Sequence, residues 1–358
     1  MPSLKEIKGR INSISSTLAI TSAMKMVAAA KLQKAQMAIQ NMLPYERRLH
    51  SMLIDLMGAM NISAAASEDG SVRGSGSAER GFGQSGDRLS LSNRHDLAGM
   101  DGAYSLMAQR EVRKVAIVAF ASNSSLCGAF NSNAIREATA VINEYRASGL
   151  GDADITVYSV GRKMAEAMKK LGFPSPADFT KMSDSPSYEA ASALAQELLD
   201  GFVSGRFDKV ELVYNHYKST SSQPTIRQTY LPLSLADATA DIQVGKITDS
   251  ASESDTNRVA EPVGAPVVRQ GSPTTEDLIV EPSKEALIAT LLPKVIRLRI
   301  FTTLLDSAAA EHAARTVAMQ LATDNGNDLL QELTLEYNKG RQQKITSEIL
   351  DLVGGSMQ

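Results

Sequence analysis

The chain has 358 residues, 43% of them hydrophobic, and a formal net charge of −3. This length suits about two domains, and no uninterrupted apolar run reaches the roughly eighteen residues that a membrane-spanning helix needs. The single cysteine, Cys127, excludes an internal disulfide. The first residues lack the charged leader and apolar core of an ordinary signal peptide, so none is expected.

The N-terminal sixty residues carry the apolar pattern of a coiled coil, because apolar residues recur at alternating steps of three and four. The positions are Leu4, Ile7, Ile11, Ile14 and Leu18, then the polar Thr21 and Lys25, then Ala28, Leu32, Ala35, Ile39 and Met42. We predict a coiled-coil helix over residues 1–63, with a possible kink at Pro44. At 1.5 Å per residue it would reach roughly 85 Å, so its apolar stripe needs a partner outside one globular domain.

The same segment is strongly basic. Residues 1–50 hold eight Lys and Arg residues against two Glu, a net charge of +6. Three interpretations remain open: a solvated helical face, a surface for an acidic partner and, more weakly, a surface for nucleic acid.

Two segments have compositions that do not support a core. Residues 64–110 are rich in Ser, Gly and Arg, and residues 236–281 hold nine acidic side chains against three basic ones. We predict a mobile insertion over 64–110 and an acidic mobile loop over 236–282.

Residues 111–235 alternate between strand and helix patterns and predict a Rossmann-like α/β domain. The expected strands cover Lys114–Phe120, Asp154–Val160, Lys209–Tyr214 and Thr225–Leu233, and the expected helices cover 131–147, Arg162–Leu171 and Ser187–Phe202. The loop Ser122–Asn131 has neither a Gly-x-Gly-x-x-Gly motif nor a P-loop, so we expect no phosphate or cofactor site there. Cys127 is expected to pack, since the four histidines form no recognisable catalytic or metal-binding set.

Residues 283–358 repeat the coiled-coil pattern at Ile288, Leu291, Val295, Leu298 and Leu305, and again at Leu330, Leu333 and Tyr337. Polar residues occupy the intervening positions of the register, at Thr302, His312, Thr316 and Thr323. Pro293 should kink the helix or delay its start, and Asp324–Asn327 should form a turn. The predicted fold class is therefore α/β, with an antiparallel coiled coil of the two terminal helices and a central Rossmann-like domain.

Five stretches resemble the F-type ATP synthase gamma subunit of bacteria. The terminal stretches are Ile14–Leu32, Glu311–Gly326 and Tyr337–Ile349, and the central ones are Ser125–Asn131 and Gln223–Leu233. They occur in the order that the family has. Most family members pass more directly from the first helix to the first strand, so residues 64–110 look like an insertion.

The resemblance implies a function for the whole chain. It implies the central rotor stalk of an ATP synthase, which transmits torque between the ion-driven membrane ring and the catalytic beta sites. The implied partners are the alpha and beta subunits of the catalytic hexamer, the epsilon subunit and the membrane c-ring, with no nucleic acid. The chain would be peripheral, at the cytoplasmic face of the bacterial plasma (inner) membrane. It would have no cofactor and no catalytic residue of its own.

The resemblance also implies contact residues. Arg341, Gln342, Thr346 and Glu348 are implied to hydrogen-bond with beta loops, and Met24 and Lys25 to meet an acidic lever segment of beta. We expect Gln342, Thr346 and Glu348 to share an approximate helix face, with Lys344 off that face. The alternative for each residue is an ordinary solvated or packed helix position. A nucleotide-dependent enzyme would need a phosphate loop, and a simple coiled-coil tether would need no α/β domain.

Overall fold

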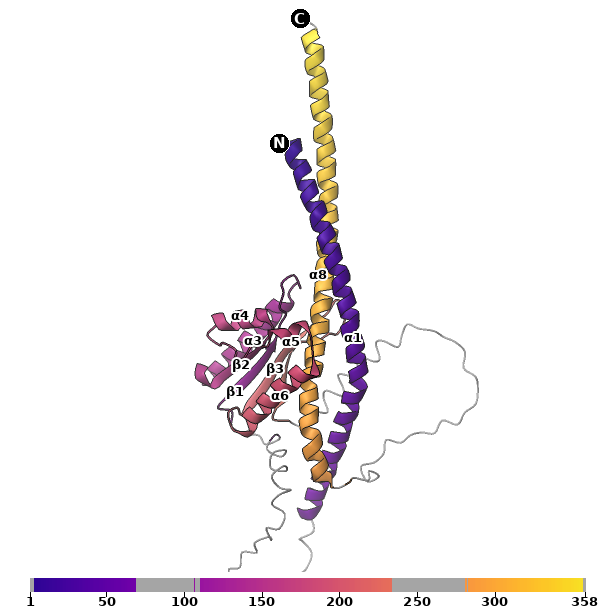
Figure 1. The fold of residues 1–358 in the computed structure, drawn as a ribbon. Helices are drawn as coiled ribbons and strands as arrows, with labels where there is room; N and C mark the ends of the chain where they lie inside the picture. Colours follow the sequence, from indigo (N-terminus) through magenta and orange to yellow (C-terminus); the bar gives the residue numbers. More distant parts are fainter. Residues whose placement is uncertain (1–2, 69–105, 107–109, 234–280, 282, 357–358) are drawn as a thin grey trace, which may run out of the picture.

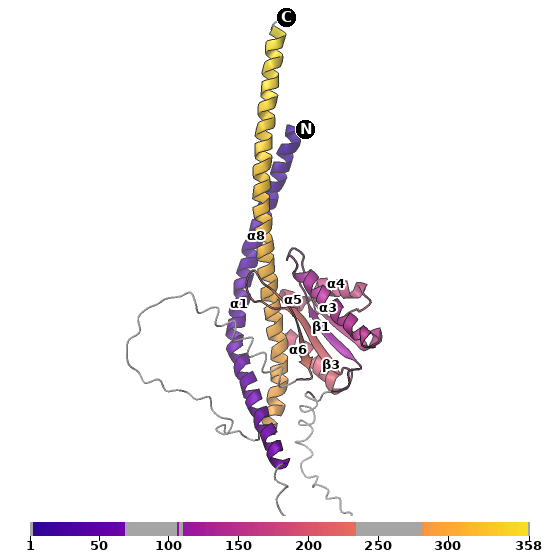
Figure 2. The same ribbon diagram turned by 180° about the vertical axis from the view of Figure 1, so that it is seen from behind.

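The computed structural model describes residues 3–68, 106, 110–233, 281 and 283–356. Helices α1 (Leu4–Glu68) and α8 (Lys284–Ser356) run antiparallel and form a rod, and a smaller α/β domain lies against its side (Figure 1). Both chain ends lie toward the same end of the rod, where α8 continues past the start of α1, as Figure 2 shows from behind. The predicted fold class is confirmed.

The seam between the two helices follows the predicted repeat. On α1 the side chains of Ile7, Ala28 and Leu32 are buried, and the other predicted seam positions from Leu4 to Met42 are half-buried. On α8 the half-buried positions beyond residue 320 recur at steps of three and four: Thr323, Gly326, Leu330, Leu333, Tyr337 and Gly340. One pair of polar positions meets across the seam, where Thr323 Oγ1 donates to Thr21 Oγ1 at 3.1 Å.

The predicted turn inside the second long helix and the predicted delay of its start are wrong, whereas the kinks expected at Pro44 and Pro293 stay predictions. Asp324–Asn327 is helical and lies within α8, because Gly326 is a seam position and Leu18 of α1 packs directly onto it. Packing along the seam overrides the local preference for a turn. Pro293 does not delay α8, which begins at Lys284, and Pro44 does not end α1.

The domain contains a four-stranded sheet in the order β2-β1-β3-β4. Its strands are β1 (Val115–Phe120), β2 (Ile155–Val160), β3 (Lys209–Asn215) and β4 (Thr225–Leu231). The first three strands are parallel, and β4 is antiparallel to β3. The helices are α3 (Phe130–Ala147), α4 (Arg162–Lys170), α5 (Thr180–Asp184) and α6 (Tyr188–Val203), with a 3-10 turn η2 (Asp152–Asp154). The short helix α5 has no counterpart in the sequence-based prediction.

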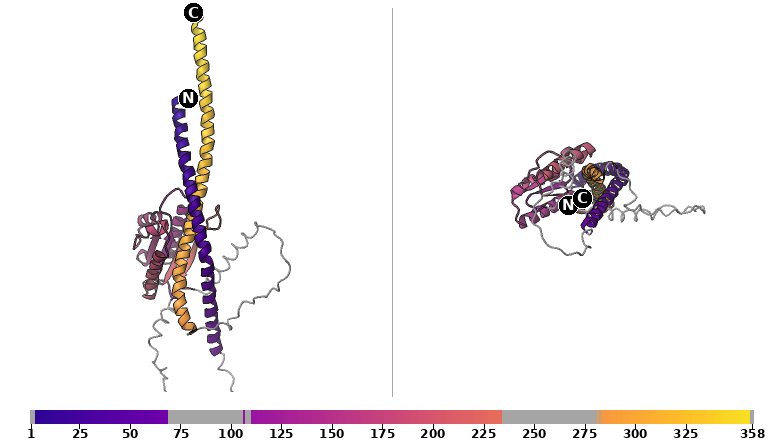
Figure 3. Two further views of the ribbon diagram at one scale, coloured as in Figure 1. Left: turned by 45° about the vertical axis from the view of Figure 1, so that its right-hand side comes forward. Right: turned by 90° about the horizontal axis from the view of Figure 1, so that it is seen from below.

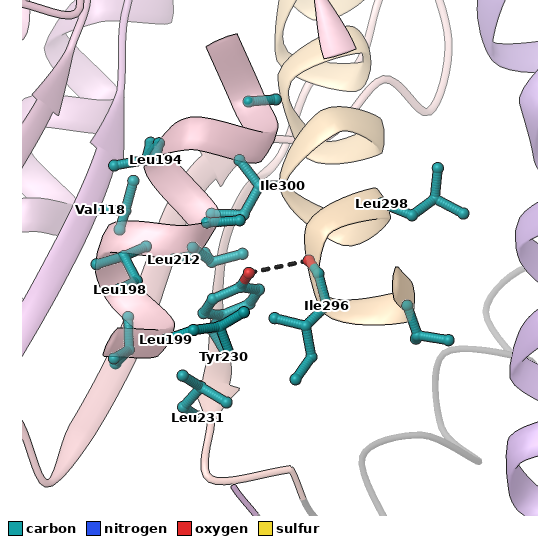
Figure 4. Packing of buried hydrophobic residues seen from close by; sticks show 14 of the residues in the cluster. Val118, Leu194, Leu198, Leu199, Leu212, Tyr230, Leu231, Ile296, Leu298 and Ile300 are labelled. Atoms are coloured by element: carbon teal, nitrogen blue, oxygen red, sulfur yellow. Dashed lines mark hydrogen bonds between the residues drawn. The ribbon is translucent and has the colours of Figure 1, made fainter. Parts of the chain in front are cut away.

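The rod supplies one of the layers that cover this sheet. Alternate residues of β1 point to opposite faces: Val115, Ile117 and Ala119 pack with α3 and α4, whereas Ala116, Val118 and Phe120 pack in a cluster with α6 and α8. Figure 4 shows the second cluster, in which the Tyr230 hydroxyl donates to the carbonyl of Ile296 on α8 at 2.9 Å. Leu49, Leu53 and Leu56 of α1 join the same cluster. The domain and the base of the rod therefore share one hydrophobic core.

A buried carboxylate ties three elements of the domain together. Glu211 on β3 accepts hydrogen bonds from Tyr145 of α3 at 2.6 Å and from Arg227 of β4 at 2.7 Å, and it pairs with Lys209. Burial opposes the charge of Glu211, but the bonds from Arg227, Lys209 and Tyr145 together hold its pKa below the ordinary value. The network fixes the edge strand β4 against the rest of the sheet.

The predicted mobile segments 64–110 and 236–282 lie almost entirely outside the described residues, and α1 continues to Glu68, past the predicted boundary at residue 63.

Candidate functional site

The rod ends in a single unpaired helix. Leu4, at the start of α1, lies beside Gly340 of α8, and a Cβ at Gly340 would approach Leu4 Cδ2 to 3.2 Å. Beyond this point every residue from Arg341 to Leu350 is exposed. Large apolar side chains are among the exposed ones, including Leu350 at 65% and Leu352 at 74%. We call residues 341–353 the tip; its apolar surface is typical of a segment that another protein covers.

The tip carries four of the predicted contact residues, and all four are exposed: Arg341, Gln342, Thr346 and Glu348. The structure corrects the expectation that Gln342, Thr346 and Glu348 share a face and that Lys344 lies off it. Thr346 Oγ1 donates to the carbonyl of Gln342 at 2.9 Å, whereas Glu348 lies 3.9 Å from Lys344 Nζ. Successive residues of a helix turn by about 100°, so Gln342 and Thr346 form one face, and Arg341, Lys344 and Glu348 form another. The tip therefore presents polar groups in two directions.

The two predicted contact residues of α1 lie on the seam. Met24 and Lys25 are half-buried, while the neighbouring Met26 and Val27 are 65% and 57% exposed. Met24 also lines a hollow of about 320 Å³ where α1, α8 and the loop after β1 meet. The other residues of this hollow are Ala23, Val27, Ala28, Lys31, Ser124, His312 and Arg315. Lys25 does not line the hollow, so only one of the two predicted residues belongs to it.

The hollow is positively charged. Arg315 pairs with the buried Glu311 at 2.7 Å and donates to Ser124 Oγ at 2.6 Å. The hydrogen bond to Ser124 also attaches the domain to α8. Burial, and then the charges of Arg315 and Lys31, lower the pKa of His312 to about 4, so this side chain is neutral at pH 7. Burial raises the pKa of Glu311 despite the opposing charge of Arg315. Arrangements of this kind suit an acidic group of a partner.

Sequence reasoning missed the hollow because its residues come from three separate segments. Arg315 and Lys31 are distant in sequence, and only the tertiary structure brings them together with Ser124. The positive charge of the first fifty residues was the one available signal. His312 was noted only as a polar position of the register.

The loop after β1 packs against α8. Cys127 is buried, as expected, and contacts Phe130, Ala310 and Ala314. Asn131 holds the loop closed, since its Nδ2 lies 3.1 Å from Cys127 Sγ and its Oδ1 accepts from the amide of Ser122 at 3.0 Å.

Within the part of the chain that the structure describes, no group of three or more His, Cys, Asp or Glu side chains is arranged to hold a metal ion. None of the described helices combines the length and the apolar character needed to cross a membrane.

Comparisons with known proteins identify the family. A family model described as ATP synthase matches residues 3–357. The ATP synthase gamma chain of Phocaeicola vulgatus is 47% identical over 357 residues, and that of Bacteroides thetaiotaomicron is 45% identical over 358 residues. Each alignment covers 100% of both chains, so these relatives share the full length of this chain.

A solved structure supports the fold independently. A chain from the rotor of the Euglena gracilis mitochondrial ATP synthase is similar with a TM-score of 0.51 and 18% identity, over 96% of this chain and 98% of that one. Full-length identity to curated relatives, the family model and the rod with its side domain agree. The chain belongs to the ATP synthase gamma chain family.

Proposed function

We propose that this chain is the central rotor stalk of a bacterial F-type ATP synthase. It transmits torque between the ion-driven ring in the membrane and the nucleotide sites of the beta subunits. The chain itself performs no chemistry and needs no cofactor, because the reaction takes place on the beta subunits. The complex is peripheral to the membrane, and we place this chain at its cytoplasmic face.

The observation that carries the proposal is the asymmetry of the rod. One helix continues alone past the other, and the tip exposes apolar and polar side chains in more than one direction. A rotor shifts the states of its partners only if it contacts those states differently. A rod that presents a different side chain at each angle meets this requirement.

We assign the partners by position along the rod. The alpha and beta subunits surround the tip, where Arg341, Gln342, Thr346 and Glu348 reach their loops. An acidic segment of beta meets the rod near Met24 and Lys25, beside the positively charged hollow. The epsilon subunit and the c-ring contact the opposite end, near the α/β domain. Nucleic acid is not a partner.

Direct observation of rotation tests the proposal. The assembled complex is immobilised through its hexamer, and a bead is attached at Lys170→Cys, an exposed position at the end of α4. Cys127 is buried, so the introduced thiol is the accessible one among the described residues. ATP should drive unidirectional rotation of the bead. Hydrolysis of ATP by the labelled complex with a stationary bead would show a passive tether instead of a rotor.

A further inference from the structure

The loop between β3 and β4 forms hydrogen bonds with both helices of the rod. Asp306 of α8 accepts two hydrogen bonds from consecutive residues of this loop: its Oδ2 lies 2.6 Å from His216 Nδ1, and its Oδ1 accepts from the amide of Tyr217 at 2.9 Å. The hydroxyl of Tyr217 in turn accepts from Gln36 Nε2 of α1 at 2.6 Å. We call these four residues, Gln36, His216, Tyr217 and Asp306, the clamp.

The clamp is set into apolar packing between the domain and both helices. Tyr217 packs against a cluster of Cys127, Phe130, Ala310 and Ala314, and also against a second cluster of Leu32, Ala309 and Ala313. The alanines of α8 are small, which allows the loop to approach the helix closely. The Asp306 side chain is only 18% exposed, so water competes little for the two oxygens that accept these hydrogen bonds.

The base of the loop is rigid. Asn215, the last residue of β3, donates from Nδ2 to the carbonyl of Phe130 at 3.0 Å and accepts from Thr225 Oγ1 at 2.6 Å. The amide of His216 donates to the carbonyl of Pro224 at 2.9 Å, which closes the loop. β3 itself lies between β1 and β4 in the sheet. A displacement of the sheet is therefore passed to the clamp without an intervening flexible joint.

The position of the domain beside the rod determines which forces the clamp must resist. Figure 3 shows that the domain lies to one side of the rod, so a force that turns the domain pushes sideways on its contacts with α8. The apolar cluster between α6 and α8 resists separation, but apolar contact has no preferred direction. Hydrogen bonds at both oxygens of one carboxylate fix the loop in two directions.

From this geometry we propose that Asp306, with His216, Tyr217 and Gln36, is a positioning element that joins the domain to both rod helices, so that all three turn as one body. The bonds from Tyr230 to Ile296 and from Arg315 to Ser124 also join the domain to the rod, but they reach α8 alone. The inference rests on the rotor function proposed above and names the residues that carry its torque across this joint. The contact to Gln36 adds a directional polar bond to the apolar packing between α1 and α8. The clamp joins the two helices at the level of the domain.

The test measures torsional stiffness in the complete complex. A bead at Lys170→Cys reports the angle of the domain while the hexamer is held fixed and ATP is scarce, so that the rotor pauses. The double variant Asp306→Ala with Tyr217→Phe removes the bonds to α8 and to α1. The variance of the bead angle during pauses should increase at least about twofold relative to the wild type. Ser221→Ala changes an exposed residue of the same loop and should leave the variance unchanged.

Conservative variants keep the test decisive if the double variant fails to assemble. Asp306→Asn retains one carbonyl oxygen for the Tyr217 amide, and Gln36→Ala removes only the bond to α1; each should give a smaller increase in the variance. Thermal unfolding of the full chain separates loss of stiffness from loss of fold. Wild-type variance in the assembled variants would overturn the clamp while leaving the rotor function intact. A wild-type bead that never rotates would refute the rotor function itself.

Discussion

The domain and the far end of the rod are built in opposite ways. In the domain all six residues of β1 are buried, and the buried carboxylate of Glu211 is surrounded by donors. From Leu321 to Leu350 no residue of α8 is buried, and a single row of half-buried positions holds it to α1. The residues that stabilise this chain are therefore separate from those that form its exposed far end. The core at the base maintains the fold, and the far end keeps its side chains exposed.

The largest expected effect lies in the domain, at Gly161. This residue has a φ of 98°, and a Cβ there would overlap the carbonyl oxygen of Ala121. Gly161→Ala should lower the free energy of unfolding of the full chain by about 3 kcal/mol or more, because backbone strain adds to a collision with fixed backbone. Urea unfolding followed by circular dichroism measures the loss.

Two matched glycines sharpen this result. Gly149 has a φ of 96° but open space around it, so Gly149→Ala reports the strain alone and should cost less. At Gly326 the obstacle is the flexible end of Leu18, 2.6 Å from the new Cβ. The gain of about 1 kcal/mol in helix propensity offsets the movement of Leu18, so Gly326→Ala should be nearly neutral. Equal losses at Gly161 and Gly326 would contradict the comparison.

The second effect concerns the buried network. Arg227→Ala removes two donors from Glu211 and leaves the carboxylate to Lys209 and Tyr145. The free energy of unfolding should fall by about 2 to 3 kcal/mol, because hydrogen bonds to a buried charge are lost. Arg113→Ala breaks an exposed pair with Glu111 and serves as the control. A result equal to this control would mean that the network does not hold β4.

The third effect is a loss of stability in acid that originates at the base of the rod. Burial, and then the charge of Arg299, lower the pKa of His50 to about 4, and its Nδ1 has no partner among the described residues. Between this pKa and the ordinary value of about 6.5, His50 is protonated in the unfolded chain but neutral in the folded one. The free energy of unfolding therefore falls as the pH drops from about 6.5 toward 4. The loss at this site should be on the order of 2 kcal/mol.

His50→Gln should reduce this acid dependence when unfolding in urea is compared at pH 7 and pH 5, and the part that remains belongs to His312, whose pKa is also lowered to about 4. The contribution of His216 to stability depends on pH in the opposite direction. The hydrogen bond to Asp306 raises its pKa, so its contribution is complete below about pH 6.5 and is lost as the pH rises through the raised pKa of the folded state. His216→Gln should therefore change the neutral side of the profile. An unchanged acid limb in the His50 variant would exclude His50 as the source.

The smallest effect in free energy belongs to the tip and should appear only in the complex. Gln342→Ala with Glu348→Ala removes one polar group from each face. We expect ATP hydrolysis by the assembled complex to slow about tenfold, equivalent to about 1.4 kcal/mol, with no change in the unfolding of the isolated chain. Steady-state hydrolysis on equal amounts of assembled complex measures the effect.

The matched control at the tip is Gln343→Ala, which changes the same residue type on neither of the two faces. Lys344 is unsuitable as a control because it lies beside Glu348. Full activity of the double variant would show that Gln342 and Glu348 do not contribute to the proposed contact with the beta subunits. Loss of chain stability would show that the tip also serves the fold.

Local periodicity was sufficient to predict the two long helices and the four strands of this fold, although it missed the short helix α5. The alternating steps from Leu4 to Met42 identified the seam of α1, because any helix with that repeat presents one apolar stripe. The apolar run from Lys114 to Phe120 identified a buried strand for a similar reason, since a strand covered on both faces needs apolar residues throughout. The exposed tip residues came only from the resemblance to a family, because an exposed polar residue on a helix has no distinguishing pattern.

The tertiary structure decided what local patterns left open. Asp324–Asn327 is helical because Leu18 packs onto Gly326, and Leu18 lies more than three hundred residues away in the chain. The hollow beside Met24 and the clamp at Asp306 each join side chains from separate elements, and no local spacing records such a meeting. Periodicity is a property of neighbours in the chain and determines which face of an element is buried. The identity of the residue that meets this face depends on how the elements pack, which is a property of the whole fold.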